Sequence, residues 1–343
     1  MKKHIRISSI AALGLTGILL LPMGAQADVK IERVTHFGGV FGMGANDTTS
    51  TDYLQGLKKR DESTVKFTGS VLGALQRFKH GDKGSQSVNI LRVDQNLMYN
   101  LDPDAKTYTQ HPLYQPPEEQ KSEQSGTGGG NEKQENDTKI TKNEFTVKAT
   151  GQKKNINGFD TSEYLITWDV ETENTKTGEK GKSLMTTDLW TAEDAKLAKA
   201  REEELAYSKA YLKLMKLPTN PDEMKLYGFG VGPGAVSVSD SKAFFDKLRT
   251  IKGYPISIDV AWKANSTGQQ NGGQSGGGQQ GNPQDLSKAL GSLFGSKKDD
   301  DSSAKSSDGM TTIFTSHTEV KSVDTGSVGS SLFEVPSDYK KED

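Results

Sequence analysis

The chain has 343 residues, 32% of them hydrophobic, and a formal net charge of −2 at pH 7. It contains no cysteine, which excludes disulfide bonds, a cysteine nucleophile, thiolate metal sites and an acylated N-terminal cysteine. The weakly acidic balance gives no general attraction to nucleic acid or anionic lipid, so we expect no nucleic-acid partner.

Residues 1–27 have the pattern of a secretory signal peptide. Basic residues at positions 2, 3 and 6 precede an apolar run, and Ala25, Gln26 and Ala27 form a small-residue cleavage site. The run is shorter than the roughly 20 residues that a membrane-spanning helix needs, and Pro22 interrupts its end. We expect cleavage near Ala27, a periplasmic or secreted mature chain, and no transmembrane anchor afterwards. Loss of the three basic residues changes the formal charge from −2 to −5.

Three stretches are rich in Gly, Ser, Gln or charge and almost free of apolar residues. Ordering them would cost backbone entropy with no burial in return. We therefore expect residues 28–343 to form a single domain with disordered insertions at 115–137, 264–284 and 295–309.

Between these insertions, apolar and polar residues alternate with the period of antiparallel strands that have one buried face. The alternation is clearest at 145–150, 164–171 and 256–263, and weaker at 28–36, 52–67, 183–190 and 310–323. The stretch 90–113 reads as a three-stranded meander, with turns at 94–96 and at 102–105.

Helices are predicted in fewer places. Thr191 with Asp194 forms a plausible capping box for a helix that ends before Pro218. Its expected apolar stripe is Ala198, Leu205, Leu212 and Met215. Further helices are expected at 239–252, 70–79 and 285–295, the last either docked on the sheet or binding a partner or membrane surface. Strands, then a helical pair, then strands indicate an α+β fold with helices on one face of an antiparallel sheet.

No motif identifies a reaction. The five histidines, at positions 4, 36, 80, 111 and 317, do not have the spacing of a metal-ligand motif. The segment 178–183 ends like a phosphate-binding loop, but Lys176 occupies the place of its first glycine. We therefore expect no enzyme, no cofactor and no metal site.

The stretch "LMYNLDPDAKTYTQHPL" (97–113) resembles a strand-turn-strand unit of the periplasmic lipoprotein carriers. Together with 53–64, 157–171, 189–198, 252–262 and 331–341, it is similar to an uncharacterised exported bacterial family of that fold. The resemblance implies a strongly curved antiparallel half-barrel whose concave apolar face is covered by helices. In the carriers that cavity holds lipoprotein acyl chains, and an arginine holds the lid; Arg60 and Arg92 are the candidates here.

This fold implies a set of ligand-facing candidates. Leu97, Tyr99 and Leu101 share one side of a strand and are expected to point into the concavity. The other candidates are Tyr164, Trp168, Trp190 and Trp262, although the three tryptophans are equally compatible with an ordinary core. Two functions stay open: a non-enzymatic envelope protein that binds a lipid or lipidated partner, such as a lipoprotein, or an envelope interaction or sensor protein that uses the fold as a platform for a protein partner.

Overall fold

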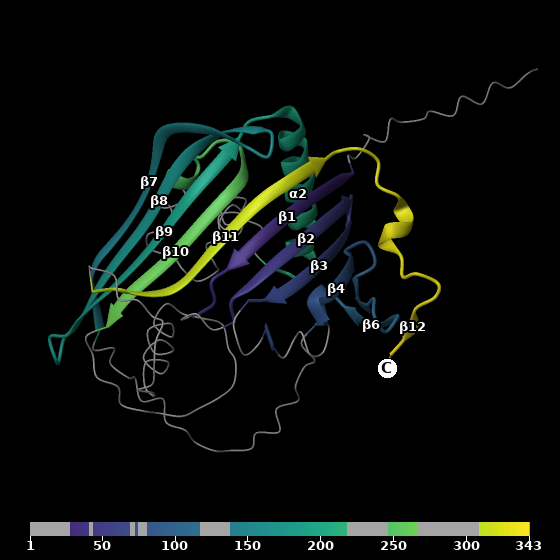
Figure 1. Ribbon diagram of the computed structural model, residues 1–343, viewed down its shortest axis with the longest axis horizontal. Helices are drawn as coiled ribbons and strands as arrows, with labels where there is room; N and C mark the ends of the chain where they lie inside the picture. Colours follow the sequence, from purple (N-terminus) through teal and green to yellow (C-terminus); the bar gives the residue numbers. More distant parts are fainter. Residues whose placement is uncertain are drawn as a thin grey trace, which may run out of the picture.

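The computed structural model describes residues 28–40, 44–68, 73–74, 81–116, 138–217, 246–266 and 309–342. In this part of the chain, twelve strands form one large open sheet that is partly curved, and α2 lies against one of its faces (Figure 1). The expected signal peptide, the expected helix at 285–295, most of the expected helix at 70–79 and the first half of the expected helix at 239–252 lie outside the described residues. So do most of the three expected insertions.

The strands in chain order are β1 (Val29–Phe37), β2 (Asn46–Gln55), β3 (Lys58–Phe67), β4 (Ser85–Arg92), β5 (Leu97–Asp102), β6 (Thr107–Pro112), β7 (Thr138–Ile156), β8 (Phe159–Asn174), β9 (Lys180–Ala192), β10 (Tyr254–Ser266), β11 (Thr311–Asp324) and β12 (Lys340–Lys341). The helical elements with assigned bounds are α2 (Ala195–Leu214) and two 3-10 turns, η1 (Gly81–Lys83) and η2 (Ser330–Phe333).

The strand order across the sheet is β12-β6-β5-β4-β3-β2-β1-β11-β10-β9-β8-β7. Neighbours are antiparallel except β12, which pairs with β6 in parallel, so the sheet is mixed. The first and last long strands of the chain, β1 and β11, meet in the middle. The described chain is therefore richer in strands than the expected α+β fold with several helices.

The predicted meander at 90–113 is confirmed as β4, β5 and β6. The expected strand at 52–67 is instead two strands, β2 and β3, separated by a turn at Gly56. Most of β2 carries polar side chains, "NDTTSTDYLQ", and so lacks the apolar alternation that marks the other strands. The insertion expected from residue 264 begins later, because β10 continues to Ser266.

Helix α2 begins one turn later than the capping box predicts. Its N-cap is Asp194, whose carboxylate accepts hydrogen bonds from the backbone N–H groups of Lys196 and Leu197, whereas Thr191 belongs to β9. The buried residues of α2 are Leu197, Ala200 and Tyr207, not the expected stripe of Ala198, Leu205 and Leu212. The expected stripe follows apolar spacing alone. It therefore leaves out the charged Glu204, which contacts Arg33 of the sheet.

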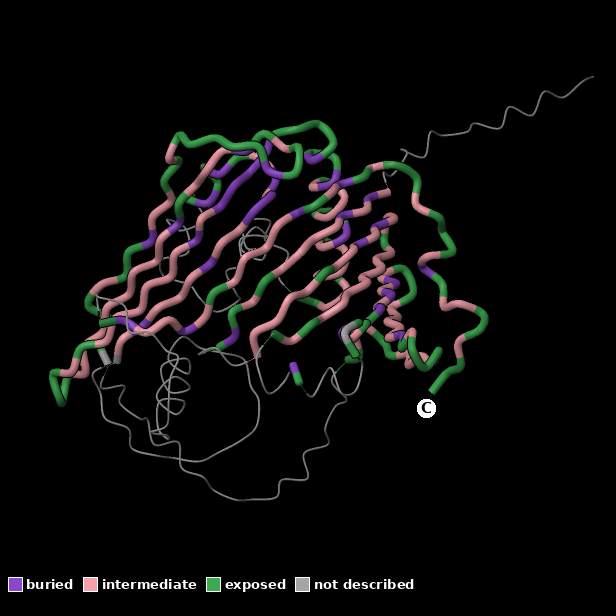
Figure 2. Tube along the Cα trace, in the orientation of Figure 1, coloured by how far each residue is buried: buried purple, intermediate pink, exposed green. Residues whose placement is uncertain are grey.

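The alternation of side chains assigns each buried residue to one of two faces. We call the side of the sheet that carries α2 the helix face; it includes Ile31, Leu54 and Ile256, which pack with Leu197. The other side is the far face, and it includes Tyr53 and the fully buried Ile90. Most of the sheet is half-buried, with buried residues scattered along the strands and more frequent towards one end (Figure 2).

Candidate functional site

A cavity of about 730 Å³ lies between α2 and the helix face of β1, β10 and β11. Residues of α2 between Arg201 and Leu212 form one wall, and side chains of neighbouring strands form the other. Most of the side chains that line it are apolar or aromatic: Leu54, Leu205, Tyr207, Tyr211, Leu212, Leu217, Tyr254, Pro255, Ile256, Ile258, Val260 and Val320. Its size and lining are those of a site for an apolar small molecule.

The rim of this cavity is also apolar. Leu205 is 38% exposed and Leu217 is 47% exposed, and both line the cavity. Large aliphatic side chains at a cavity mouth lower the cost of moving an apolar group from water into the interior. Two exposed leucines therefore line the cavity, together with the charged Arg201 and Glu204 of α2.

One buried polar group in the cavity belongs to Tyr207, which is 7% exposed. Among the described residues, its hydroxyl has no hydrogen-bond partner. Burial, reinforced by Tyr211 and Asp52, raises the pKa of Tyr207, so the phenol stays neutral. An unpaired buried hydroxyl is costly, and the polar end of a ligand would satisfy it.

Arg33 of β1 joins the sheet to α2. Its guanidinium contacts the carboxylate of Asp52 on β2 and donates to Glu204 Oε1 on α2 at 2.8 Å. It also donates to the hydroxyl of Tyr254 on β10 at 3.0 Å. Arg33 thus ties α2 to three strands through charge-assisted hydrogen bonds at the edge of the cavity.

Two neighbouring carboxyl groups extend this network. Lys59 Nζ lies 2.8 Å from Asp52 Oδ1, and Asp61 is paired directly with Asp52 across β2 and β3. Burial raises the pKa of Asp52, but Lys59 and Arg33 lower it more, so its pKa lies below the ordinary value. Burial, together with the hydrogen bond to Asp52 and its negative charge, raises the pKa of Asp61 to about 6. The Asp52–Asp61 pair therefore adjoins the contact between Arg33 and α2.

Three of the expected ligand-facing residues lie on the other side of the sheet. Tyr99 pairs with Ile90, and Leu101 is 5% exposed in a cluster with Ile90 and Phe333. Leu97 shares their side of β5 by alternation, so all three lie on the far face and none lines the cavity beneath α2. The alternation in the sequence correctly groups these side chains. It does not show which face α2 covers, because that depends on where the chain runs after β9.

The two arginines proposed to hold a lid also lie on the far face. Arg60 Nη1 donates to the carbonyl of Leu332 at 3.0 Å, and Arg92 Nη1 donates to Glu334 Oε1 at 2.8 Å. Both therefore hold the C-terminal segment, residues 325–342. The arginine that contacts α2 is Arg33, and its signal in the sequence is a charged residue in the same alternating set as Val29 and Ile31.

Three more candidates lie on the helix face but outside the cavity. Tyr164 and Trp168 pack against a cluster that contains Leu248 and Ile251, described residues in and after the helical turn at 246–248. Trp262 packs edge-on against Phe314, with ring centroids 5.7 Å apart. The indole N–H of Trp168 is bonded to Asn143 Oδ1 at 2.8 Å, and that of Trp262 to Ser183 Oγ at 2.7 Å.

Trp190, the last candidate, is on the far face. It is 5% exposed, and Lys154 Nζ lies 3.8 Å from its ring centroid in a cation–π contact. None of the seven expected residues lines the cavity beneath α2. The residues that do line it come mainly from α2, β10 and β11.

No protein-family model, curated protein or solved structure matches the chain. Within the described ranges, no helix is both long and apolar enough to cross a membrane.

Proposed function

We propose that the chain is a non-enzymatic cell-envelope protein that binds an apolar ligand, such as an acyl chain or a lipidated partner, beneath α2. The observation that carries this proposal is the cavity of about 730 Å³ with mainly apolar walls and an apolar rim. A cavity of this size accommodates a drug-sized or single-chain ligand.

The likeness to the lipoprotein carriers is part of this proposal and rests on the sequence. A partly curved sheet that carries a helix on one face is compatible with the half-barrel that the resemblance implies (Figure 1). Export and a periplasmic or secreted location are part of the proposal and rest on residues 1–27 alone.

We expect α2 to move away from the sheet when a ligand enters, and the Arg33 network opposes that movement. Arg33 and Glu204 are joined at 2.8 Å across the boundary between β1 and α2. Leu197 and Ala200, both fully buried, hold the first half of the helix. The second half carries the exposed Leu205 and reaches the exposed Leu217, so we expect it to move first.

Native mass spectrometry of the purified chain tests the proposal directly. We expect a population that carries an additional mass of a lipid and loses it on activation in the gas phase. A titration with a fluorescent fatty-acid probe should then show saturable binding. An unliganded mass together with no saturable binding would refute the proposal.

A matched pair of variants locates the site. Ser208 lines the cavity, whereas Ala206 is exposed on the same helix, so a tryptophan at either position adds a similar ring inside or outside the cavity. Ser208→Trp should weaken probe binding by about 10-fold or more, because a large side chain fills space that the ligand needs. Ala206→Trp should bind as the unmodified chain does. Equal binding by both variants would exclude the cavity as the site.

A cross-linking experiment distinguishes the second role, that of an envelope interaction protein. Cross-linking in intact cells followed by purification should yield a discrete protein adduct if the fold is a platform for a partner. Such an adduct without any retained lipid mass would favour that role over lipid binding.

A further inference from the structure

The charged side chains that line the cavity beneath α2 gather near Tyr254. They are Arg33, Lys59, Arg201 and Glu204. Arg33 donates to the hydroxyl of Tyr254 at 3.0 Å, and Arg201 Nη1 donates to the carbonyl of the preceding Gly253 at 2.9 Å. Glu204 is bonded to Arg33, and Lys59 is joined to Arg33 through Asp52. The cavity therefore has a charged end.

Away from this end the lining is uncharged. The cavity follows β10 from Tyr254 to Val260, a distance of about 20 Å along an extended strand. Ile256 and Ile258 lie between them on the same side of the strand. On the opposite wall, Arg201 lies beside Gly253, and the leucines that line the cavity follow it along α2. A long apolar space with one charged end has the shape and polarity of an amphiphile.

Two of the three cations in the lining are already matched by carboxylates. Arg33 contacts Asp52 and donates to Glu204 Oε1 at 2.8 Å. Lys59 Nζ lies 2.8 Å from Asp52 Oδ1, and Asp61 is paired with Asp52 across β2 and β3. These charges compensate one another within the protein, so this network has little attraction left for a further anion.

Arg201 is the cation whose charge is not matched in this way. Its side chain is half-buried, and among the described residues its guanidinium bonds only to the carbonyl of Gly253, a neutral group. A guanidinium carries five N–H donors and keeps its charge at every physiological pH. Its planar fork matches the two oxygens of a carboxylate. Arg201 thus has both spare donors and an uncompensated charge at the wall of the cavity.

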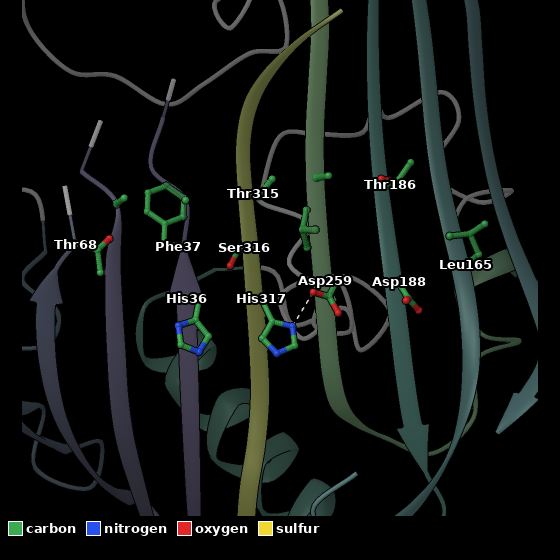
Figure 3. A pocket seen from close by; sticks show the side chains of 14 residues that line it. His36, Phe37, Thr68, Leu165, Thr186, Asp188, Asp259, Thr315, Ser316 and His317 are labelled. Carbon is green, nitrogen blue, oxygen red and sulfur yellow. Dashed lines mark hydrogen bonds and ion pairs between the residues drawn. The ribbon is translucent and has the colours of Figure 1, made fainter. Parts of the chain in front are cut away.

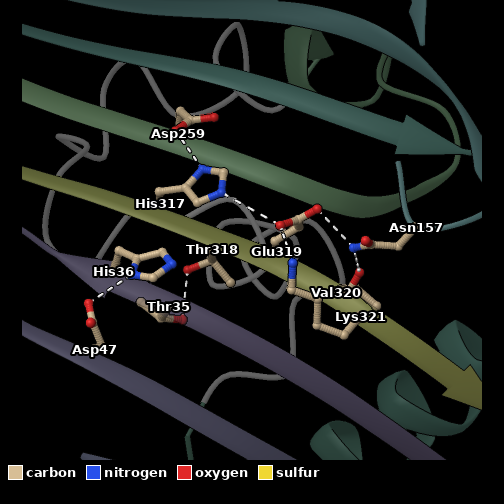
Figure 4. Close-up of polar contacts among 10 residues, drawn as sticks. All are labelled: Thr35, His36, Asp47, Asn157, Asp259, His317, Thr318, Glu319, Val320 and Lys321. Atoms are coloured by element: carbon tan, nitrogen blue, oxygen red, sulfur yellow. Dashed lines mark hydrogen bonds and ion pairs between the residues drawn. The ribbon is translucent and has the colours of Figure 1, made fainter. Parts of the chain in front are cut away.

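The hollow on the far face has the opposite character. It has a volume of about 500 Å³, and Figure 3 shows its titratable lining residues His36, His317, Asp188 and Asp259. Its described lining contains no lysine or arginine. His317 Nδ1 is bonded to Asp259 Oδ1 at 2.6 Å, and His36 Nδ1 to Asp47 Oδ1 at 2.7 Å (Figure 4). These carboxylates disfavour an anionic head group and would favour a cationic one.

We propose that the ligand beneath α2 is a single-chain amphiphile with a free carboxylate, and that Arg201 binds this head group. The inference rests on the proposed function and narrows it, because an acyl chain attached to a protein has lost its free carboxylate. One unmatched cation suits a head with a single negative charge. A phosphate monoester carries about −1.5 to −2 charges at pH 7 and would lie close to Glu204.

The test compares three probes that share one alkyl chain and differ in the head group. The full chain, freed of any co-purified lipid, is titrated in a calorimeter with decanoate, decanol and decyltrimethylammonium. We expect decanoate to bind about 10-fold more tightly than decanol, because a hydrogen bond to a charged group contributes more than a neutral one. Decyltrimethylammonium should bind most weakly, since its cation meets Arg201.

A matched pair of variants assigns the preference to one residue. Arg201→Gln should reduce the affinity for decanoate to that for decanol and leave the affinity for decanol unchanged. Lys209→Gln removes an exposed cation of the same helix that lies outside the described lining, and it should leave all three affinities unchanged. Circular dichroism checks that both variants keep their secondary structure. The comparison of probes in the unmodified chain needs no variant, so it decides even if Arg201→Gln is poorly folded.

The possible failures are distinguishable. Equal affinities of decanoate and decanol for the unmodified chain would overturn the carboxylate head and leave the apolar site in place. A preference for decanoate that survives in a folded Arg201→Gln variant would overturn the role of Arg201. Tight binding of decyltrimethylammonium that persists in Ser208→Trp would place the ligand in the far-face hollow and also overturn the inference. No binding of any probe would refute the proposed function together with the inference.

Discussion

The two faces of the sheet are covered in different ways. On the far face, the C-terminal segment packs the side chain of Phe333 against Val88, Ile90 and Leu101, and Phe333 is 0% exposed. On the helix face, α2 buries Leu197 and Ala200 near its start but stands over a cavity of about 730 Å³ along its second half.

The chemistry of attachment differs as well. Arg60 and Arg92 bind backbone carbonyls of the C-terminal segment, so they fix its path along the strands. Arg33 binds a side chain, Glu204, at a single point of α2. The C-terminal segment is held by its backbone around a fully buried aromatic side chain. Helix α2 is held by its buried first half, by the bond from Arg201 to the carbonyl of Gly253 at 2.9 Å and by the ion pair of Glu204, and a cavity remains beneath it. The cavity therefore results from the way in which α2 covers the helix face.

The largest expected effect is on the tightly packed side. Phe333→Ala should lower the free energy of unfolding by about 3–5 kcal/mol, because it removes a fully buried aromatic side chain and leaves a cavity. Urea denaturation followed by circular dichroism measures this difference. Leu332→Ala, at a partly buried neighbour, should cost clearly less. Equal losses would mean that Phe333 is not the main anchor of the C-terminal segment.

Breaking the ionic anchor of α2 should have an intermediate effect. Arg33→Met leaves Glu204 without its partner and Asp52 with Lys59 alone. The expected loss is about 2 kcal/mol, below the value for a fully buried pair because the Arg33 side chain is 21% exposed. Hydrogen exchange of the α2 amides should increase, while exchange in β4 and β5 should not. A double-mutant cycle with Glu204→Gln isolates the direct contact, and a coupling near zero would contradict this role for Arg33.

A smaller, pH-dependent effect is expected at Asp61. Its pKa is raised from 3.8 to about 6 in the folded chain, so the folded state holds this proton more strongly than the unfolded state. The stabilisation is complete below pH 3.8 and is lost as the pH rises through about 6. Because Asp61 is partly exposed, we expect a loss of about 1 kcal/mol after allowance for solvent screening.

Asp61→Asn removes this proton linkage and keeps the shape of the side chain. Its stability relative to the unmodified chain should therefore increase from pH 4 to pH 7, as measured by urea denaturation at a series of pH values. Asp160→Asn, at an exposed carboxylate of β8 that accepts a hydrogen bond from the neutral amide of Asn155, is the control and should show no such trend. A constant difference for Asp61→Asn would exclude a raised pKa at this position.

The smallest effect is expected for an exposed ion pair at the end of the C-terminal segment. Lys106 Nζ lies 2.8 Å from Asp338 Oδ2, and both side chains are more than half exposed. Water and salt screen such a pair, so Lys106→Ala should leave the unfolding midpoint unchanged within error. A clear shift would mean that the C-terminal segment is held at its end as well as at Phe333.

Local features of the fold could be predicted from the sequence. The turn at Asp102 forms because its carboxylate accepts hydrogen bonds from the N–H groups of Asp104 and Ala105, both at 2.9 Å. The expected shared face of Phe145 and Val147 is confirmed, because these residues pair with Trp168 and Ile166. Each of these features depends on residues that are near in the sequence or on regular alternation.

The location of the candidate site could not be predicted in this way. Leu97, Tyr99 and Leu101 share one side of β5, as the alternation predicts. Whether α2 or the C-terminal segment covers that side depends on where these two segments return to the sheet. Arg33 is a charged residue on the buried side of β1, and its partners are up to 221 residues away in the chain. Apolar patterns do not reveal such a contact, since each partner taken alone reads as a surface residue.

The parallel pairing of β12 with β6 has a consequence for how copies of this chain behave at high concentration. The last residues occupy part of one edge of the sheet, with Lys340 and Lys341 beside Thr107 and Tyr108. The opposite edge, β7, has 19 residues, five of which are lysines, and its pairing with β8 is interrupted by two register shifts. Charge repulsion and irregular geometry both disfavour growth by addition of a strand at an edge. Residues 340–341 thus cover part of one border of the sheet, and lysines with irregular pairing disfavour strand addition at the other.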